Sequence, residues 1–106
     1  MGGSAPEPGG RSTTVALSGP ITLAEAPRWR DALLSALAGG GDLRLDLAES
    51  GPWDLAGLQL VLATLASGRR AGQGVRLARV PHVFAAIAER AGVAGQLAEV
   101  IDARLD

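Results

Sequence analysis

The chain has 106 residues, which is enough for one ordinary domain with one modest core, and we expect residues 12–106 to form it. Ten basic and eleven acidic residues give a formal net charge of -1, which argues against a general binder of nucleic acid or of anionic membranes. The chain has no Cys and no apolar run long enough to span a bilayer. We therefore expect a cytoplasmic protein without membrane insertion, disulfides or thiolate metal sites.

The first part of the chain changes character at Ser12. Residues 1–11 are mostly Gly, Pro, Ser and Ala, and we expect them to be a disordered tail or a cloning remnant. From Ser12 on, polar and apolar residues alternate, with Val15 and Leu17 on one side. This alternation predicts a first strand that ends at the turn Gly19-Pro20.

A first helix is predicted to follow and to end at Ala38. Thr22 and Glu25 have the spacing of a capping box, so the helix starts either at Leu23 or, with Pro27 in first position, at Ala26. One helical face carries four apolar residues, namely Ala26, Trp29, Leu33 and Leu37. The glycines at 39–41 then predict a turn.

A second strand is predicted over Asp42–Leu47, where leucines alternate with charged residues. After a connection over 48–53, Asp54 suits the N-cap of a central helix that begins at Leu55. Trp53 and Leu58 have the spacing of a hydrophobic staple. The helix either frays near Gly68 or continues to Ala71 with Gly72 as its cap. Its apolar stripe comprises Leu58, Val61, Leu62 and Leu65.

The last third of the chain predicts a strand over 75–78 and a helix over 81–91 that Gly92 ends in a left-handed conformation. The inward face of this helix is expected to consist of Val83, Phe84, Ile87 and Ala91. Residues 97–105 have helical spacing and favour a short helix, with a short edge strand at Val100-Ile101 after a loop at 94–95 as the alternative.

The order of these elements predicts the fold class. Strands that alternate with helices pair in parallel through right-handed crossovers, which gives an α/β domain. Because all three strands alternate, only one face of the sheet is expected to be buried. We therefore predict a small two-layer domain, with a mainly parallel sheet of about four strands and three to four helices mostly on one face.

Few residues are available for catalysis. His82 is the only histidine, there is no Cys or Tyr, and no Ser lies in a nucleophile-elbow motif. We predict no enzyme activity and no catalytic, metal or cofactor site, and we interpret His82 as a solvated residue. The arginines near the third strand suggest either a patch for an acidic partner or a solvated surface. They are Arg69, Arg70, Arg76 and Arg79.

Leu45-Asp46-Leu47 ends a predicted strand in Asp-Leu, and Trp53 to Leu60 places Asp54, Gly57 and Leu58 at the start of an apolar helix. In this pattern the chain resembles the STAS domain family of anti-sigma-factor antagonists, whose motif Asp-[Ser/Thr]-x-Gly-Leu opens such a helix. The flanking stretches Leu17-Ser18-Gly19 and Arg90-Ala91-Gly92-Val93 also match, and the resemblance covers about Thr13 to Val100.

The resemblance implies a regulatory protein-binding module that a partner kinase often phosphorylates on the Ser or Thr after the motif Asp. Here Leu55 and Ala56 occupy those positions, so we expect the usual phospho-switch to be absent, with Ser50 as a possible replacement acceptor. We expect Trp53 to be a partly exposed anchor of the binding surface. The predicted partner-binding residues are Ser50, Trp53, Asp54, Leu55, Ala56, Gly57 and Gln59.

Family analogy suggests three kinds of protein partner: an anti-sigma-factor kinase, a chemosensory or two-component protein, or the ATPase of a lipid-transport ABC complex. A second hypothesis is a small-ligand module with a lipid or nucleotide pocket under the central helix. A well-formed cavity with convergent polar groups would favour that alternative.

Overall fold

The computed structural model of the chain describes residues 12–102, so the predicted tail over 1–11 and residues 103–106 lie outside the described part. In chain order the elements are β1 (Ser12–Ala16), β2 (Gly19–Ile21), α1 (Ala26–Ala38), β3 (Asp42–Asp46), β4 (Ser50–Trp53), α2 (Leu55–Arg70), β5 (Val75–Ala78), α3 (His82–Arg90) and α4 (Ala94–Ala98).

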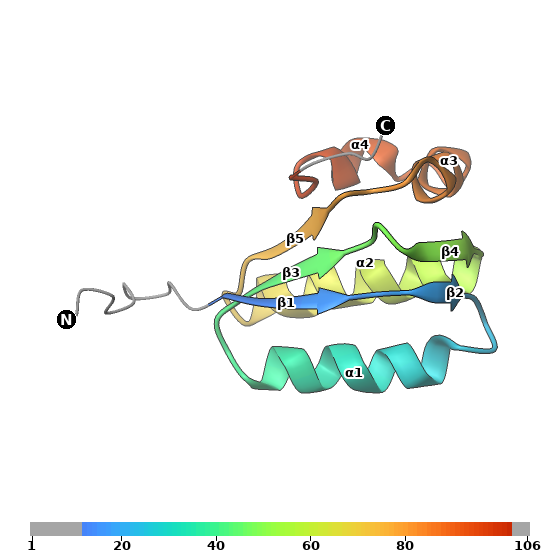
Figure 1. Ribbon diagram of the computed structural model, residues 1–106. Helices are drawn as coiled ribbons and strands as arrows, with labels where there is room; N and C mark the ends of the chain where they lie inside the picture. Colours follow the sequence, from blue (N-terminus) through green and yellow to red (C-terminus); the bar gives the residue numbers. More distant parts are fainter. Residues whose placement is uncertain (1–11, 103–106) are drawn as a thin grey trace.

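The main sheet is parallel and has the order β1-β3-β5 (Figure 1). Its central strand alternates as predicted, because Leu43 and Leu45 are buried and Arg44 is exposed. The wet face carries Arg44 and Arg76, which both form ion pairs with Asp102. The predicted α/β class and the one-sided burial of the sheet are confirmed.

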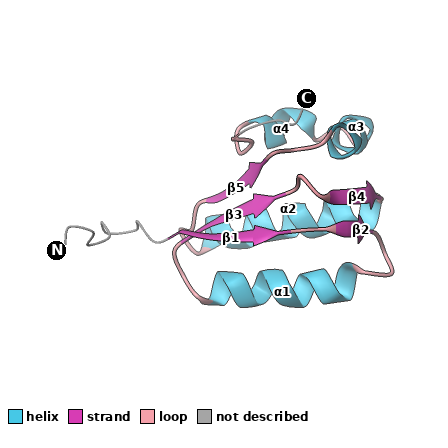
Figure 2. Cartoon of the chain, viewed as in Figure 1, coloured by secondary structure: helices cyan, strands magenta, loops and turns pink. Residues whose placement is uncertain are grey.

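The helices surround the buried side of this sheet. In Figures 1 and 2, α2 runs behind the strands, α1 lies beside β1, and α3 and α4 lie beyond β5. The buried stripe of α2, which includes Leu58, Val61 and Leu65, joins the leucines of β3 in one core. That core fixes the start of α2 against the ends of the strands.

Two short strands were not predicted. β2 and β4 pair in parallel with an irregular register, where we expected a turn and a connection. Figure 1 shows them continuing the lines of β1 and β3. Their residues include Pro20, Gly51 and Pro52, which disfavour strands locally, so the pairing depends on the neighbouring elements already being in place.

Pro27 marks the start of α1, and Gly72 and Gly92 mark the turns after α2 and α3. α1 starts at Ala26, the later of the two predicted starts, with Pro27 in its first turn. α2 continues to Arg70, and Gly72 and Gly92 adopt the positive φ angles of 73° and 78° expected after α2 and α3. Of the two endings that the sequence left open, the structure has the continuation past Gly68, although α2 ends at Arg70 and its C-cap is Ala71 rather than Gly72.

The C-terminal part differs from the prediction at two places. The inward face of α3 consists of Phe84 and Ala88, with the predicted Ile87 half-buried against the core. Val83 and Ala91 are exposed, because the helix turns its contact face toward β4 and α2. Residues 94–95, predicted as a loop, begin α4, which ends at Ala98. Of residues 97–105, which were predicted to favour a short helix, only Leu97 and Ala98 are helical within the described part. Ile101 instead forms a parallel bridge with Leu77, which agrees with the alternative of a short edge strand at Val100-Ile101.

Candidate partner-binding site

Asp54 connects two segments that are far apart in the sequence. Its carboxylate accepts one hydrogen bond from the Gly57 amide, at 3.1 Å, and one from the Leu23 amide, at 3.0 Å. These bonds, the one from Gly57 first, lower the pKa of Asp54 below its ordinary value. The predicted N-cap is confirmed, and the same side chain holds the turn before α1 against the start of α2.

Gly57 lies where α2 comes closest to β2. A Cβ atom at this position would lie 2.1 Å from the carbonyl oxygen of Ile21 and 3.0 Å from the Trp53 ring. Only glycine allows the helix to approach the strand this closely. Gly57 is therefore buried, and it shapes the site without offering a side chain to a partner.

Trp53 is buried, so the expectation of a partly exposed anchor is wrong. Its exposed fraction is 7%, and its ring packs edge-on against Phe84 with the ring centroids 4.8 Å apart. The indole Nε1 donates a hydrogen bond to the Ser50 hydroxyl at 2.9 Å. The pairing of β4 with β2, which the sequence did not reveal, draws Trp53 inward.

The Ser50 hydroxyl is used inside the domain. It accepts the bond from Trp53 and donates a hydrogen bond of 2.7 Å to the Leu47 carbonyl. Phosphorylation of Ser50 stays a prediction, and a phosphate there would have to replace both bonds.

The exposed surface at this end of the domain is apolar. Leu55 in the first turn of α2 is 53% exposed, and Leu23 in the turn before α1 is 72% exposed. Gln59 is also exposed, while Ala56 is half-buried. Because the Leu23 amide binds Asp54, the residue before Leu55, the two leucines belong to neighbouring backbone segments.

An open groove of about 350 Å³ lies next to these leucines, between the starts of α1 and α2. The residues that line it are Leu23, Ala26, Pro27, Arg30, Ala56, Gln59 and Leu60. The sequence predicted a binding surface at the start of α2, but it did not predict that residues at the start of α1 line the same groove. The capping-box spacing of Thr22 and Glu25 located the turn, but not its contact with Asp54.

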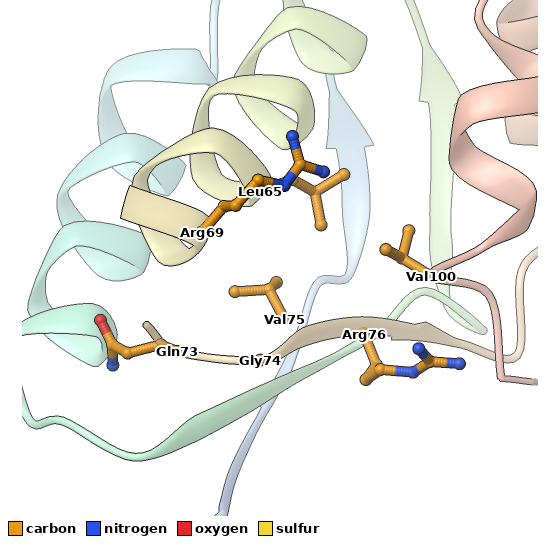
Figure 3. Close-up of a pocket in the computed structure, with 7 residues that line it drawn as sticks. All are labelled: Leu65, Arg69, Gln73, Gly74, Val75, Arg76 and Val100. Carbon is orange, nitrogen blue, oxygen red and sulfur yellow. The ribbon is translucent and has the colours of Figure 1, made fainter. Parts of the chain in front are cut away.

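Two of the four arginines near β5 form ion pairs within the domain. Arg76 donates to Asp102 at 2.6 Å and Arg79 to Asp46 at 2.6 Å, so both cations are paired within the domain. Arg69 and Arg76 border a hollow of about 200 Å³ between α2 and β5. In Figure 3 its apolar part is formed by Leu65, Val75 and Val100, and Arg76 projects away from Val75.

A family model identifies the family of this chain, and a solved structure shares its fold. A family model described as "Mlab, STAS domain" matches residues 5–101. A solved structure, a sulfate transporter family protein from Wolinella succinogenes, is similar with a TM-score of 0.70 and 16% identity, over 95% of this chain and 80% of that chain. No curated protein matches the chain significantly.

Within residues 12–102, no helix has the length and apolar character needed to cross a bilayer. STAS domains are generally non-enzymatic and commonly mediate protein–protein interactions. The family match extends over nearly the whole chain, and the Asp54–Gly57 geometry agrees with the motif that the sequence resembles. The chain belongs to the STAS domain family.

Proposed function

We propose that this chain is a non-catalytic, cytoplasmic regulatory module that binds a protein partner at the start of α2 without the usual phospho-switch. The observation that carries the proposal is the pair of exposed leucines, Leu23 and Leu55, beside an open apolar groove. Large apolar side chains grouped on a small domain are typical of an interaction site. The partner is a protein of a kind that family analogy suggests: an anti-sigma-factor kinase, a chemosensory or two-component protein, or an ABC-transporter ATPase.

The absence of the switch follows from the residues after the motif Asp. Leu55 and Ala56 have no hydroxyl to receive a phosphate. A phosphate at this place would add almost two negative charges to the docking surface, whereas Leu55 adds apolar contact area that is always present. The proposed module therefore binds constitutively.

The anchor residues of the proposed surface are not the residue predicted from the sequence, because Trp53 is buried. Leu23 and Leu55 take the role first given to Trp53, while Asp54 and Gly57 position them. Gln59 and Ala56 border the same groove and stay in the proposed contact set.

The small-ligand alternative has less support. The hollows described above lie at the surface between elements, and the face of α2 toward the sheet is occupied by core side chains such as Leu58 and Val61. The lipid or nucleotide pocket expected under α2 would need that space.

The proposal is tested by affinity capture of the tagged full chain from its native cytoplasm, with co-purifying proteins identified by mass spectrometry. A defined protein should be captured by the wild type and lost about tenfold or more with Leu55→Asp, because a buried leucine contributes about 1.5–3 kcal/mol. Ala98→Asp adds the same charge at an exposed position of α4, and this variant should capture the partner normally. Equal capture by Leu55→Asp and by the wild type, with both folded by circular dichroism, would contradict the proposal.

A further inference from the structure

A second hollow extends the groove along α1 and α2. It has a volume of about 240 Å³ and shares Arg30 and Leu60 with the first hollow, which is the groove of about 350 Å³ between the starts of α1 and α2. Beyond these two residues, α1 contributes Leu34 and Leu37, and α2 contributes Ala63 and Ser67. The lining residues recur every three or four positions on both helices, so the two hollows form one continuous groove between them.

The two helices run in the same direction along this groove. From the first hollow to the second, the residue numbers rise on both α1 and α2, and Figure 1 shows both helices running away from the same end of the sheet. The lining extends over 26–37 on α1 and 56–67 on α2, which is about 17 Å at the rise of an α-helix. This length corresponds to about three turns of a third helix.

The chemistry of the groove selects a helical occupant. Its walls are helices whose backbone groups are already paired, so an extended peptide lying on the apolar side chains would leave its own amides and carbonyls unpaired. A helix satisfies its own backbone groups and packs a ridge of side chains into such a groove. Leu34, which is 47% exposed, offers apolar contact at the far end.

The charge of the groove indicates that the bound helix carries an acidic side chain. Arg30 is the one charged residue that lines either hollow, and it lines both. Within residues 12–102 it takes part in none of the ion pairs, which belong to Arg44, Arg76 and Arg79. The hydroxyl of Thr64, which also faces the groove, is satisfied by the Leu60 carbonyl at 2.8 Å.

We infer that the partner segment is an amphipathic helix of about three turns that lies in the α1/α2 groove and places an acidic side chain against Arg30. This inference rests on the proposed function, because the groove begins at Leu23 and Ala56, beside Leu55. Beyond the proposed function, the inference specifies the conformation, the length and the charge of the partner segment that binds in the groove.

The first test uses a display library of amphipathic helical peptides of about 14 residues, selected against the immobilised full chain. Peptides with Asp or Glu beside an apolar stripe should be enriched and should gain helicity when they bind. Arg30→Glu should weaken the enriched acidic peptide about fivefold or more, and the same peptide with Lys in place of its acid should prefer the Arg30→Glu chain. Arg90→Glu, which makes the same charge change on α3, should leave both affinities unchanged.

Three results would overturn the inference: enrichment without acidic residues, binding of an extended peptide, or failure of the charge exchange. The native-partner capture separates this inference from the proposed function. If Leu55→Asp abolishes capture and Arg30→Glu does not change it, the docking site stands and the acidic helix is wrong. If Leu55→Asp has no effect, the proposed function itself fails.

A second test examines the far end of the groove. The chain contains no Cys, so Leu34→Cys introduces a single thiol beside the second hollow. Single-Cys versions of the enriched peptide should form a disulfide with it at one position of the peptide, because a disulfide requires Cα atoms within about 7 Å. Ala98→Cys on α4 is the control. Trapping that is equal at both sites, or absent at Leu34→Cys, would show that the helix does not follow the groove.

Discussion

At the scale of single residues, Gly57 decides how closely α2 can approach β2. A methyl group there would meet the Ile21 carbonyl, which belongs to the backbone and cannot turn aside. Gly57→Ala should therefore destabilise the domain by about 3 kcal/mol, although alanine is the better helix former. Gly95→Ala, inside α4 with open space around it, should be neutral or slightly stabilising. Thermal unfolding of the two variants checks this, and equal melting temperatures would contradict the close approach.

Asp46 gives a pH-dependent contribution to stability. The Arg79 guanidinium, and then the Ala48 amide, lower the pKa of this carboxyl below its usual value of 3.8. A lowered pKa in the folded state means that the stabilisation is present above pH 3.8 and is lost as the pH falls through the folded-state pKa. Solvent screens the pair, because the Arg79 side chain is more than half exposed.

Asp46→Asn should therefore lower the free energy of unfolding by about 1 kcal/mol at pH 7 and by little below the folded-state pKa. Denaturant unfolding across this pH range measures the difference from the wild type. Asp31→Asn, on the exposed surface of α1, should show no such convergence. A deficit that is constant with pH would exclude the ion pair as its cause.

At the scale of elements, the junction between β4 and α2 places a residue that stabilises the fold close to a residue that is proposed to bind the partner. Trp53→Ala would leave a cavity beside Phe84 and should cost about 3 kcal/mol, which lowers the melting temperature by roughly 10 °C or more. Leu55→Ala, two residues later and exposed, should change stability by less than about 0.5 kcal/mol while weakening partner capture. Calorimetry and capture of both variants check this contrast. A stable Trp53→Ala protein with lost binding would restore the anchor role.

The elements also show what the sequence could predict. Alternation around Leu43 and Leu45 predicted β3 and its buried face, and Asp54 predicted where α2 starts, because both signals are local. β2 and β4 were missed, since Pro20, Gly51 and Pro52 disfavour strands and only tertiary pairing places them. The orientation of Trp53 depends on that pairing, and the part that Leu23 and Arg30 play in the site depends on how α1 packs beside α2.

At the scale of the whole molecule, the proposed loss of the phospho-switch can be tested by measuring the mass of the intact protein. The intact wild-type chain, captured from its native cytoplasm with its partner, should have the mass of the unphosphorylated sequence. Leu55→Glu, which places a negative charge where the phosphate would lie, should reduce capture about tenfold or more, whereas Leu55→Met should preserve it. A mass increase of one phosphate would show that a switch survives, and Ser50 would be the first residue to replace.

The two hydrogen bonds of Asp54 also determine how much order the docking surface has before any partner arrives. Since one carboxylate holds both the Leu23 amide and the Gly57 amide, the segments that present Leu23 and Leu55 keep a fixed spacing in the free protein. Association then costs little conformational entropy on this side of the interface. The heat-capacity change of binding should accordingly match the apolar area covered, without the larger contribution that accompanies coupled folding.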